Sequence, residues 1–221
     1  MEGKTGDFSI AEVISKLKKT IKGFPVPSVK VIAGKKDPFA VLISCLISLR
    51  TRDEVTESAS ARLFSLAKSP AQLLKLSNLE IEKAIYPAAF FRNKARSLKT
   101  LCEVLVNEHL GKVPDKLDEL LNLKGVGRKT ANLTLILGYD KLGICVDIHV
   151  HRISNRWGYV KTKNPDETEM VLREILPKRF WKGYNDLLVS FGQNLCKPVS
   201  PFCKTCPIED QCPKVGVSRF R

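Results

Sequence analysis

"LNLKGVGRKTANL", residues 121–133, places two glycines, Gly125 and Gly127, on either side of a single valine. Apolar residues at helical spacing precede it in "DKLDELLNL" and follow it in "TANLTLILGY". Glycine can adopt backbone angles that are closed to other residues, and it leaves no side chain between the backbone and a ligand. The stretch therefore predicts two helices joined by a tight turn, with Val126 packed between them.

The same residues could be taken for a nucleotide-binding loop with Lys129 on the phosphate. Such a loop needs Gly, four residues and then Gly-Lys-Ser/Thr, after a buried strand. Here Arg128 follows Gly127, the residue five before Gly127 is Asn122, and no buried strand precedes the turn. Spacing and context both argue against a nucleotide loop.

Helical spacing of apolar residues extends along almost the whole chain, with breaks at positions such as Gly111, Pro114, Gly138 and Pro165. No segment has the pattern of a β-hairpin, and no alternation of strands and helices suggests a parallel sheet. We therefore predict an all-α fold. Asn164, followed by a proline and two acidic residues, marks one helix start.

Composition indicates the kind of partner. The 221 residues, 43% of them hydrophobic, suit one or two domains. The net charge of +14, from 37 Lys and Arg against 23 Asp and Glu, suggests a polyanion such as nucleic acid, although a merely basic protein is the alternative. No apolar run approaches the ~20 residues of a membrane span, and residues 1–28 lack a signal-peptide core. We expect a cytoplasmic protein with no membrane partner.

The turn itself is a candidate phosphate site. The N–H groups at the start of its second helix point outward, beside the positive end of the helix dipole. With the charge of +14, this predicts contacts between a nucleic-acid backbone and Gly125, Val126, Gly127 and Arg128. An ordinary helical hairpin without a ligand is the alternative.

"LKGVGRKTAN" resembles the "LPGVGRKTAN" hairpin of the endonuclease III family of DNA glycosylases. That family has an Asp eighteen residues beyond the hairpin Lys, in "VDTH", and this chain has "VDIH" with Asp147 eighteen beyond Lys129. The similarity runs from about Phe39 to Cys212. It implies Lys129 as nucleophile and Asp147 as its catalytic partner.

The resemblance also implies an architecture with two lobes. Residues 35–137 would form a six-helix barrel that carries the hairpin. Residues 1–34 and 138–221 would form the second lobe, which includes a C-terminal cysteine loop. A monomeric, nucleoid-associated enzyme is expected.

The implied activity is that of a bifunctional glycosylase and abasic-site lyase, which removes oxidised pyrimidines from double-stranded DNA and cleaves the 3′ side by β-elimination. A carboxylate such as Asp147 can stabilise the oxocarbenium character of the sugar. An uncharged Lys129 can form a Schiff base, although an unperturbed lysine has a pKa of ~10.4. Partial desolvation and the helix start would lower that pKa, whereas Asp147 would raise it or accept the proton, directly or through water.

Other interpretations of the same residues stay open. Lys129 could be a phosphate contact and Asp147 a helix N-cap. A monofunctional glycosylase for deaminated or mismatched bases shares the fold but generally lacks the hairpin Lys, and a non-catalytic helix-hairpin-helix protein would not need Asp147. Asp147, His149 and His151 could bind a metal, but we expect His149 to line the pocket, as its family counterpart does, and His151 to be structural.

Four of the seven cysteines crowd the C-terminal segment, whereas Cys45, Cys102 and Cys145 lie singly in apolar segments and are expected in the core. The four are Cys196, Cys203, Cys206 and Cys212. Their spacing, C-x6-C-x2-C-x5-C, allows one zinc ion or one iron–sulfur cluster. Because this spacing equals that of the endonuclease III cluster loop, the resemblance implies a [4Fe–4S] cluster, with zinc as the alternative.

A base inside a duplex must be flipped out before Lys129 can reach its sugar. The family plugs the gap from two loops, which match "SLRTRD" (residues 48–53) and "FFRNKA" (residues 90–95). Many members have Gln and Leu where this chain has Arg50 and Phe90, and Phe90 could instead pack in the core. We expect Arg50 and Phe90 to plug the duplex. Lys197 and Lys204 are expected to contact phosphates from the cysteine loop, or else to be merely solvated.

Overall fold

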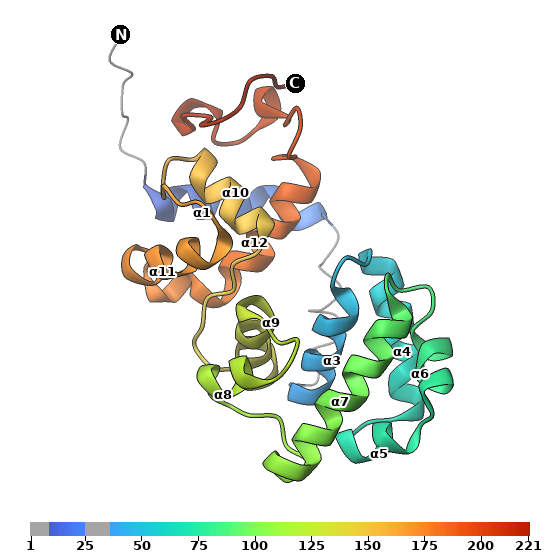
Figure 1. Ribbon diagram of the computed structural model, residues 1–221. Coiled ribbons are helices and arrows are strands. Elements are labelled where there is room, and N and C mark those ends of the chain that lie inside the picture. The colour runs from blue at the N-terminus through green and yellow to red at the C-terminus, as the bar shows by residue number, and fades with distance from the viewer. Residues whose placement is uncertain (1–8, 25–35) are drawn as a thin grey trace. The chain divides into compact units, whose positions relative to one another are not determined.

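The computed structural model describes residues 9–24 and 36–221 (Figure 1). These residues form helical segments joined by loops and contain no β-strand, which confirms the predicted all-α fold. They make two compact units, one of residues 9–24 and 144–221 and one of residues 36–143. Within the described ranges, no helix has the length and apolar character needed to span a membrane.

The unit of residues 36–143 carries the glycine turn. Its helices are α3 (Pro38–Ser48), α4 (Asp53–Leu66), α5 (Pro70–Lys75), α6 (Asn78–Ile85), α7 (Phe91–His109), α8 (Leu117–Asn122) and α9 (Arg128–Leu133), which continues as the π-helical η3 (Thr134–Gly138).

Side-chain caps set several of these helix starts. The Asp37 carboxylate accepts hydrogen bonds from Phe39 N at 2.9 Å and Ala40 N at 3.2 Å, at the start of α3. Ser77 and Glu80 form a capping box at α6, in which each side chain accepts a hydrogen bond from the other residue's backbone N–H. Such caps satisfy N–H groups that have no partner inside the helix.

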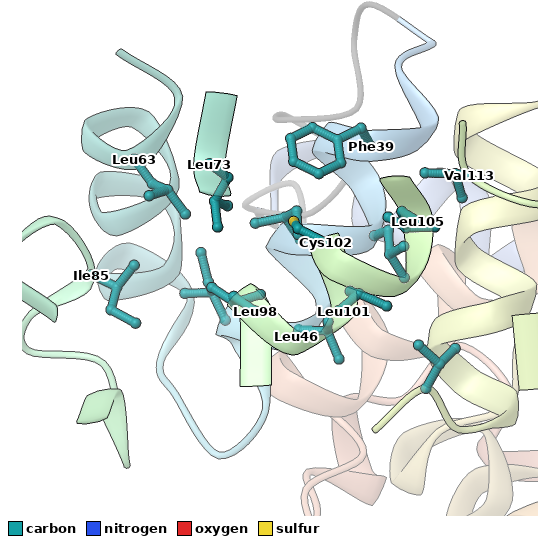
Figure 2. Close-up of a cluster of buried hydrophobic side chains, with 14 of the residues drawn as sticks. Phe39, Leu46, Leu63, Leu73, Ile85, Leu98, Leu101, Cys102, Leu105 and Val113 are labelled. Carbon is teal, nitrogen blue, oxygen red and sulfur yellow. The ribbon is translucent and has the colours of Figure 1, made fainter. Parts of the chain in front are cut away.

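The core of this unit is organised around α7, which contacts α3, α5 and α6. Leu98, Leu101 and Leu105 recur at helical spacing and are almost fully buried. Figure 2 shows them among side chains such as Phe39 of α3 and Leu63 of α4. Burial of each leucine contributes ~1.5–3 kcal/mol relative to an exposed position.

Residues 138–143 belong to the unit of residues 36–143, not to the C-terminal lobe in which the sequence placed them. Gly138 lies against Pro38 so closely that a Cβ atom at Gly138 would stand 2.7 Å from the Pro38 Cα. Lys141 Nζ also pairs with the Asp115 carboxylate at 2.6 Å. Because of these contacts, the second unit begins at residue 144 and not at residue 138. The predicted boundary between residues 34 and 35 lies outside the described residues.

The second unit has its own hydrophobic core, which includes Trp157, Tyr184 and Phe191. The predicted Asn164 cap is present, since its side chain accepts a hydrogen bond from Glu167 N at 2.9 Å. The helical segments are α1 (Ile10–Thr20), η1 (Ile21–Gly23), α10 (Ile148–Arg156), α11 (Pro165–Ile175), η4 (Lys178–Phe180), α12 (Trp181–Asn194), η5 (Cys203–Thr205) and η6 (Glu209–Gln211).

Candidate functional site

The glycine turn joins α8 to α9, as predicted (Figure 1). Gly125 has a φ of +86°, in the left-handed region that favours glycine. Val126 is buried and its N–H donates to Leu123 O at 3.0 Å, which closes the turn. Gly127 is the N-cap of α9. The hairpin therefore has the predicted form, with its second helix beginning at Arg128.

Gly127, unlike Gly125, has ordinary backbone angles. Its φ of −94° and ψ of 174° are open to most residues. A Cβ atom there would meet no protein atom within 4 Å. The fold itself therefore does not require glycine at this position, and a Cβ atom there would point into open space.

Lys129 lies in the first turn of α9 and is exposed. Its charge acts on Cys45 of α3. Burial raises the pKa of the Cys45 thiol to about 12, and the positive charge of Lys129 partly opposes this rise. Cys45, Cys102 and Cys145 are all buried, as predicted for core cysteines.

Asp147 is the N-cap of α10 in the other unit. Its Oδ1 accepts hydrogen bonds from His149 N at 2.9 Å and Val150 N at 3.0 Å, and the residue is 7% exposed. The N-cap interpretation is therefore confirmed. It is compatible with a catalytic role, since the two bonds fix the orientation of an otherwise rotatable carboxylate. Lys129 and Asp147 belong to different units.

His149 and His151 have different surroundings on α10. His149 Nδ1 lies 3.2 Å from Nη2 of the Arg152 guanidinium. It also lies close to Gly192 of α12, since a Cβ atom added to Gly192 would stand 2.5 Å from His149 Nδ1. His151 Nδ1 lies 2.7 Å from Thr168 Oγ1 of α11, which gives it the structural role expected. Across residues 9–24 and 36–221, no three His, Cys, Asp or Glu side chains are grouped to hold a single metal ion.

The four C-terminal cysteines line one pocket, together with apolar side chains such as Trp157, Phe191 and Phe202. Burial raises the pKa of Cys206 to about 11, and negative charge on neighbouring cysteines adds to the effect. Burial also raises the pKa of Cys203 and Cys212. Thiols in such a place bind protons strongly, so a positively charged metal centre would be needed to keep them as thiolates.

Arg156 connects α10 to the pocket of the four cysteines. Its Nη1 donates to Cys196 Sγ at 3.3 Å and to Lys197 O at 2.9 Å, and its Nη2 donates to Pro198 O at 3.2 Å. A donor to sulfur stabilises a thiolate ligand. The donor set of four cysteines and this hydrogen bond fit a thiolate-bound iron–sulfur cluster.

The two lysines predicted to contact phosphates lie in the same loop. Lys197 is half-buried, with Nζ 5.2 Å from the centre of the Phe202 ring. Lys204 is exposed, and its backbone N–H donates to Arg221 O at 2.9 Å. Both lysines therefore reach the surface of the cysteine loop, Lys204 more fully.

Arg50 and Phe90, predicted from two separate loops, lie next to each other. The Arg50 guanidinium carbon is 5.8 Å from the centre of the Phe90 ring. Both side chains are exposed, Phe90 to 60%, and both residues have positive φ angles, 55° and 58°. Core packing of Phe90 is therefore wrong. The neighbouring Phe91 packs against the core instead.

Two polar residues around this pair were not predicted. Lys94 and Thr51 connect the loops that carry Arg50 and Phe90, through hydrogen bonds between segments more than forty residues apart. The sequence "FFRNKA" contains Lys94, but nothing in its spacing distinguishes it from a solvated lysine on a basic protein. Its acceptors are mostly backbone carbonyls, which leave no mark in a sequence.

Residues 43–178, more than half of the chain, match the family model described as HhH-GPD superfamily base excision DNA repair protein. The chain belongs to this superfamily. Endonuclease III of Thermotoga maritima is 46% identical over 176 residues, which cover 80% of this HhH-GPD chain and 83% of that relative. Endonuclease III homolog 2, chloroplastic, of Arabidopsis thaliana is 42% identical over 188 residues, which cover 81% of this chain but only 49% of the plant protein.

Solved structures of HhH-GPD proteins are also similar. "Structure of a Trapped Endonuclease III-DNA Covalent Intermediate: Estranged-Adenine Complex" matches with a TM-score of 0.82 at 31% identity, covering 93% of this chain and 94% of that one. "Structure of a thermostable thymine-DNA glycosylase" matches with a TM-score of 0.80 at 24% identity, over 92% and 93% of the two chains. The second likeness is one of fold alone.

Proposed function

We propose that this protein is a bifunctional DNA glycosylase and abasic-site lyase, which removes oxidised pyrimidines from double-stranded DNA. The observation that carries the proposal is Lys129 in the first turn of the helix that follows the glycine turn. A backbone phosphate at Gly127 would bring the sugar of a nearby nucleotide to an amine on the same helix end. The similarity to a trapped endonuclease III–DNA intermediate supports a covalent mechanism.

In the proposed reaction, the bond between the base and the sugar C1′ breaks, and the base leaves with the bonding electrons. The Asp147 carboxylate stabilises the positive charge that develops on the sugar. The uncharged Nζ of Lys129 forms a bond to C1′ and gives up one of its two protons. The bond between C1′ and the ring oxygen O4′ then breaks, O4′ takes a proton, and the nitrogen lone pair forms the protonated imine. Removal of a C2′ proton then expels the 3′ phosphate by β-elimination.

Lys129 is exposed, so bound DNA would desolvate it further. A duplex laid on the glycine turn would exclude water from the first turn of α9. Loss of solvation and the positive helix end both disfavour the ammonium form, whereas phosphates favour it. We propose that Asp147 accepts the proton, so that activation of Lys129 depends on the bound substrate.

We further propose that Cys196, Cys203, Cys206 and Cys212 hold a [4Fe–4S] cluster. Four cysteine ligands leave no open coordination position, so the cluster would order the loop that presents Lys197 and Lys204 to phosphates. The purified protein should have visible iron–sulfur absorbance and about four iron atoms per chain. A colourless protein with one zinc ion would contradict this assignment.

Borohydride trapping tests the proposed function. The wild-type protein should form a covalent adduct with duplexes that contain an abasic site or an oxidised pyrimidine. The Lys129→Ala variant should form none, while Lys124→Ala, which removes an exposed lysine of the same turn, should trap normally. An adduct that persists in Lys129→Ala would place the nucleophile elsewhere.

A set of duplexes that varies the lesion and the opposite base would test the substrate class. Preference for deaminated or mismatched bases, without strand cleavage, would favour a monofunctional glycosylase. Binding without any reaction would indicate a non-catalytic DNA-binding protein. Monomeric state, a location in the cytoplasm near the nucleoid and a pocket role for His149 stay predictions.

A further inference from the structure

The loops that carry Arg50 and Phe90 are connected by one ammonium group. Lys94, in the first turn of α7, donates from Nζ to Ile47 O at 2.5 Å, to Leu49 O at 2.7 Å and to Thr51 Oγ1 at 2.9 Å. An ammonium has three N–H groups, so these three acceptors use all of them. The acceptors surround Arg50 along the chain, before and after it.

Thr51 extends this connection to the second loop. Its Oγ1, which accepts from Lys94, also accepts from Ala89 N at 3.1 Å. Ala89 immediately precedes Phe90. The segments on both sides of the Arg50–Phe90 pair are therefore joined through Lys94 and Thr51.

The pair needs such support because its backbone is strained. Arg50 and Phe90 have φ angles of 55° and 58°, which large side chains rarely adopt. Each such residue costs ~1–3 kcal/mol and persists only where the surrounding structure holds it. The contact between their exposed side chains is worth only ~0.5–1 kcal/mol, too little to offset two strained residues.

The surroundings of Lys94 suit it to hold these strained residues in place. Burial lowers its pKa to about 8, so the group is still mostly an ammonium at neutral pH. A half-buried charge is costly unless it is fully hydrogen-bonded, and here it is. The three hydrogen bonds of Lys94 all end on the segment of residues 47–51.

We propose that Lys94 is a positioning residue, which holds Arg50 and Phe90 in the geometry that plugs a duplex after a base is flipped out. The inference rests on the proposed function, and it assigns Lys94 no contact with the reacting atoms. Plugging matters only where a second strand must be held apart. Lys94 should therefore matter for duplex DNA and not for single-stranded DNA.

The test compares the trapping rate on an abasic duplex with the rate on its abasic strand alone. Lys94→Met keeps the length of the side chain and removes the donors. It should lower the duplex rate by about tenfold or more, a loss of ~1.4 kcal/mol, and change the single-strand rate by less than about twofold. Lys99→Met is the matched control, because Lys99 lies on the same helix and donates to a loop carbonyl, Leu76 O at 2.9 Å, away from the pair.

A second readout follows the DNA and does not depend on chemistry. 2-Aminopurine placed opposite a non-cleavable abasic analogue should brighten when the wild-type protein unstacks it, and Lys94→Met should bind without this increase. If Lys94→Met does not fold, Thr51→Val takes its place, since it removes one acceptor and keeps the β-branched shape. Thr51→Val should also lower the duplex rate selectively.

The outcomes separate the two proposals. Suppose that the wild-type protein traps both substrates. The positioning role is then wrong if Lys94→Met lowers the duplex and single-strand rates equally, and it is also wrong if Lys94→Met lowers neither rate. Partial recovery of the duplex rate in Lys94→Arg supports it, because the guanidinium restores a charged donor. If the wild-type protein traps neither substrate, the proposed function falls and takes this inference with it.

Discussion

The glycine turn and the Arg50–Phe90 pair both use left-handed backbone angles, but they use them differently. At the turn the angle belongs to Gly125, with a φ of +86°, where it costs little. At the pair the angles belong to two large side chains, and they need hydrogen bonds from distant residues to persist. The turn offers backbone N–H groups to a ligand, whereas the pair offers side chains.

The difference shows why the turn could be predicted from the sequence, whereas the residues that support the Arg50–Phe90 pair could not. A site made of backbone needs glycines at fixed spacing, and these can be seen in residues 121–133. A site made of strained side chains needs a support from elsewhere in the fold, here Lys94 and Thr51. If this distinction holds, substitutions can change the backbone geometry and the functional group separately.

The largest effect is expected at Asp147, where one carboxylate both caps a helix and is proposed to do chemistry. Asp147→Asn should keep the cap, because Asn is as good an N-cap as Asp, but lose the charge. Base removal should fall by about 10²–10⁴-fold while the melting temperature stays unchanged. Parallel measurements of glycosylase rate and thermal unfolding check this, and an active Asp147→Asn would contradict the electrostatic role.

Next in size is a substitution that occupies the proposed phosphate site. Gly127→Asp places a good N-cap at the start of α9, so stability should stay level or rise by a few tenths of a kcal/mol. The carboxylate would take the N–H groups that a phosphate needs and repel DNA. Duplex affinity should fall about tenfold or more, measured at fixed salt. Gly127→Ala is the control, with a smaller loss, and unchanged affinity in Gly127→Asp would remove the phosphate from this turn.

Gly125→Ala should lower the stability of the fold. Nothing lies near its added Cβ atom, but the φ of +86° disfavours alanine. We expect a loss of ~1–2 kcal/mol in the free energy of unfolding, measured with urea. Equal stability of the Gly125→Ala and Gly127→Ala variants would show that the two glycines do not differ as described.

The smallest expected effect is a gain in stability. Phe90→Gly removes a strained large residue that is 60% exposed, so the free energy of unfolding should rise by up to about 1 kcal/mol even as the plugging side chain is lost. Urea unfolding with the duplex rate measured in parallel checks this. A destabilised Phe90→Gly that keeps its duplex rate would mean that Phe90 serves packing after all.

Local sequence patterns were enough to predict the helices, the turn at Gly125 and the buried Val126, because caps, apolar spacing and glycines act over a few residues. The exposure of Lys129 and the ordinary angles of Gly127 could not be predicted, because they depend on what the rest of the unit places nearby. The boundary at residue 144 was missed for the same reason, since Gly138 packs on Pro38, a hundred residues earlier. Lys94 is the clearest case, because two of its three acceptors are backbone carbonyls, which any sequence would supply.

The central claim is that the glycine turn holds a phosphate by its backbone and so leaves Lys129 to act as the nucleophile. The most direct measurement is to digest the borohydride-reduced adduct and locate the attached sugar by mass spectrometry. We predict the added mass on Lys129 and on no other amine. Attachment at Lys124, at another lysine or at a terminal amine would contradict the account.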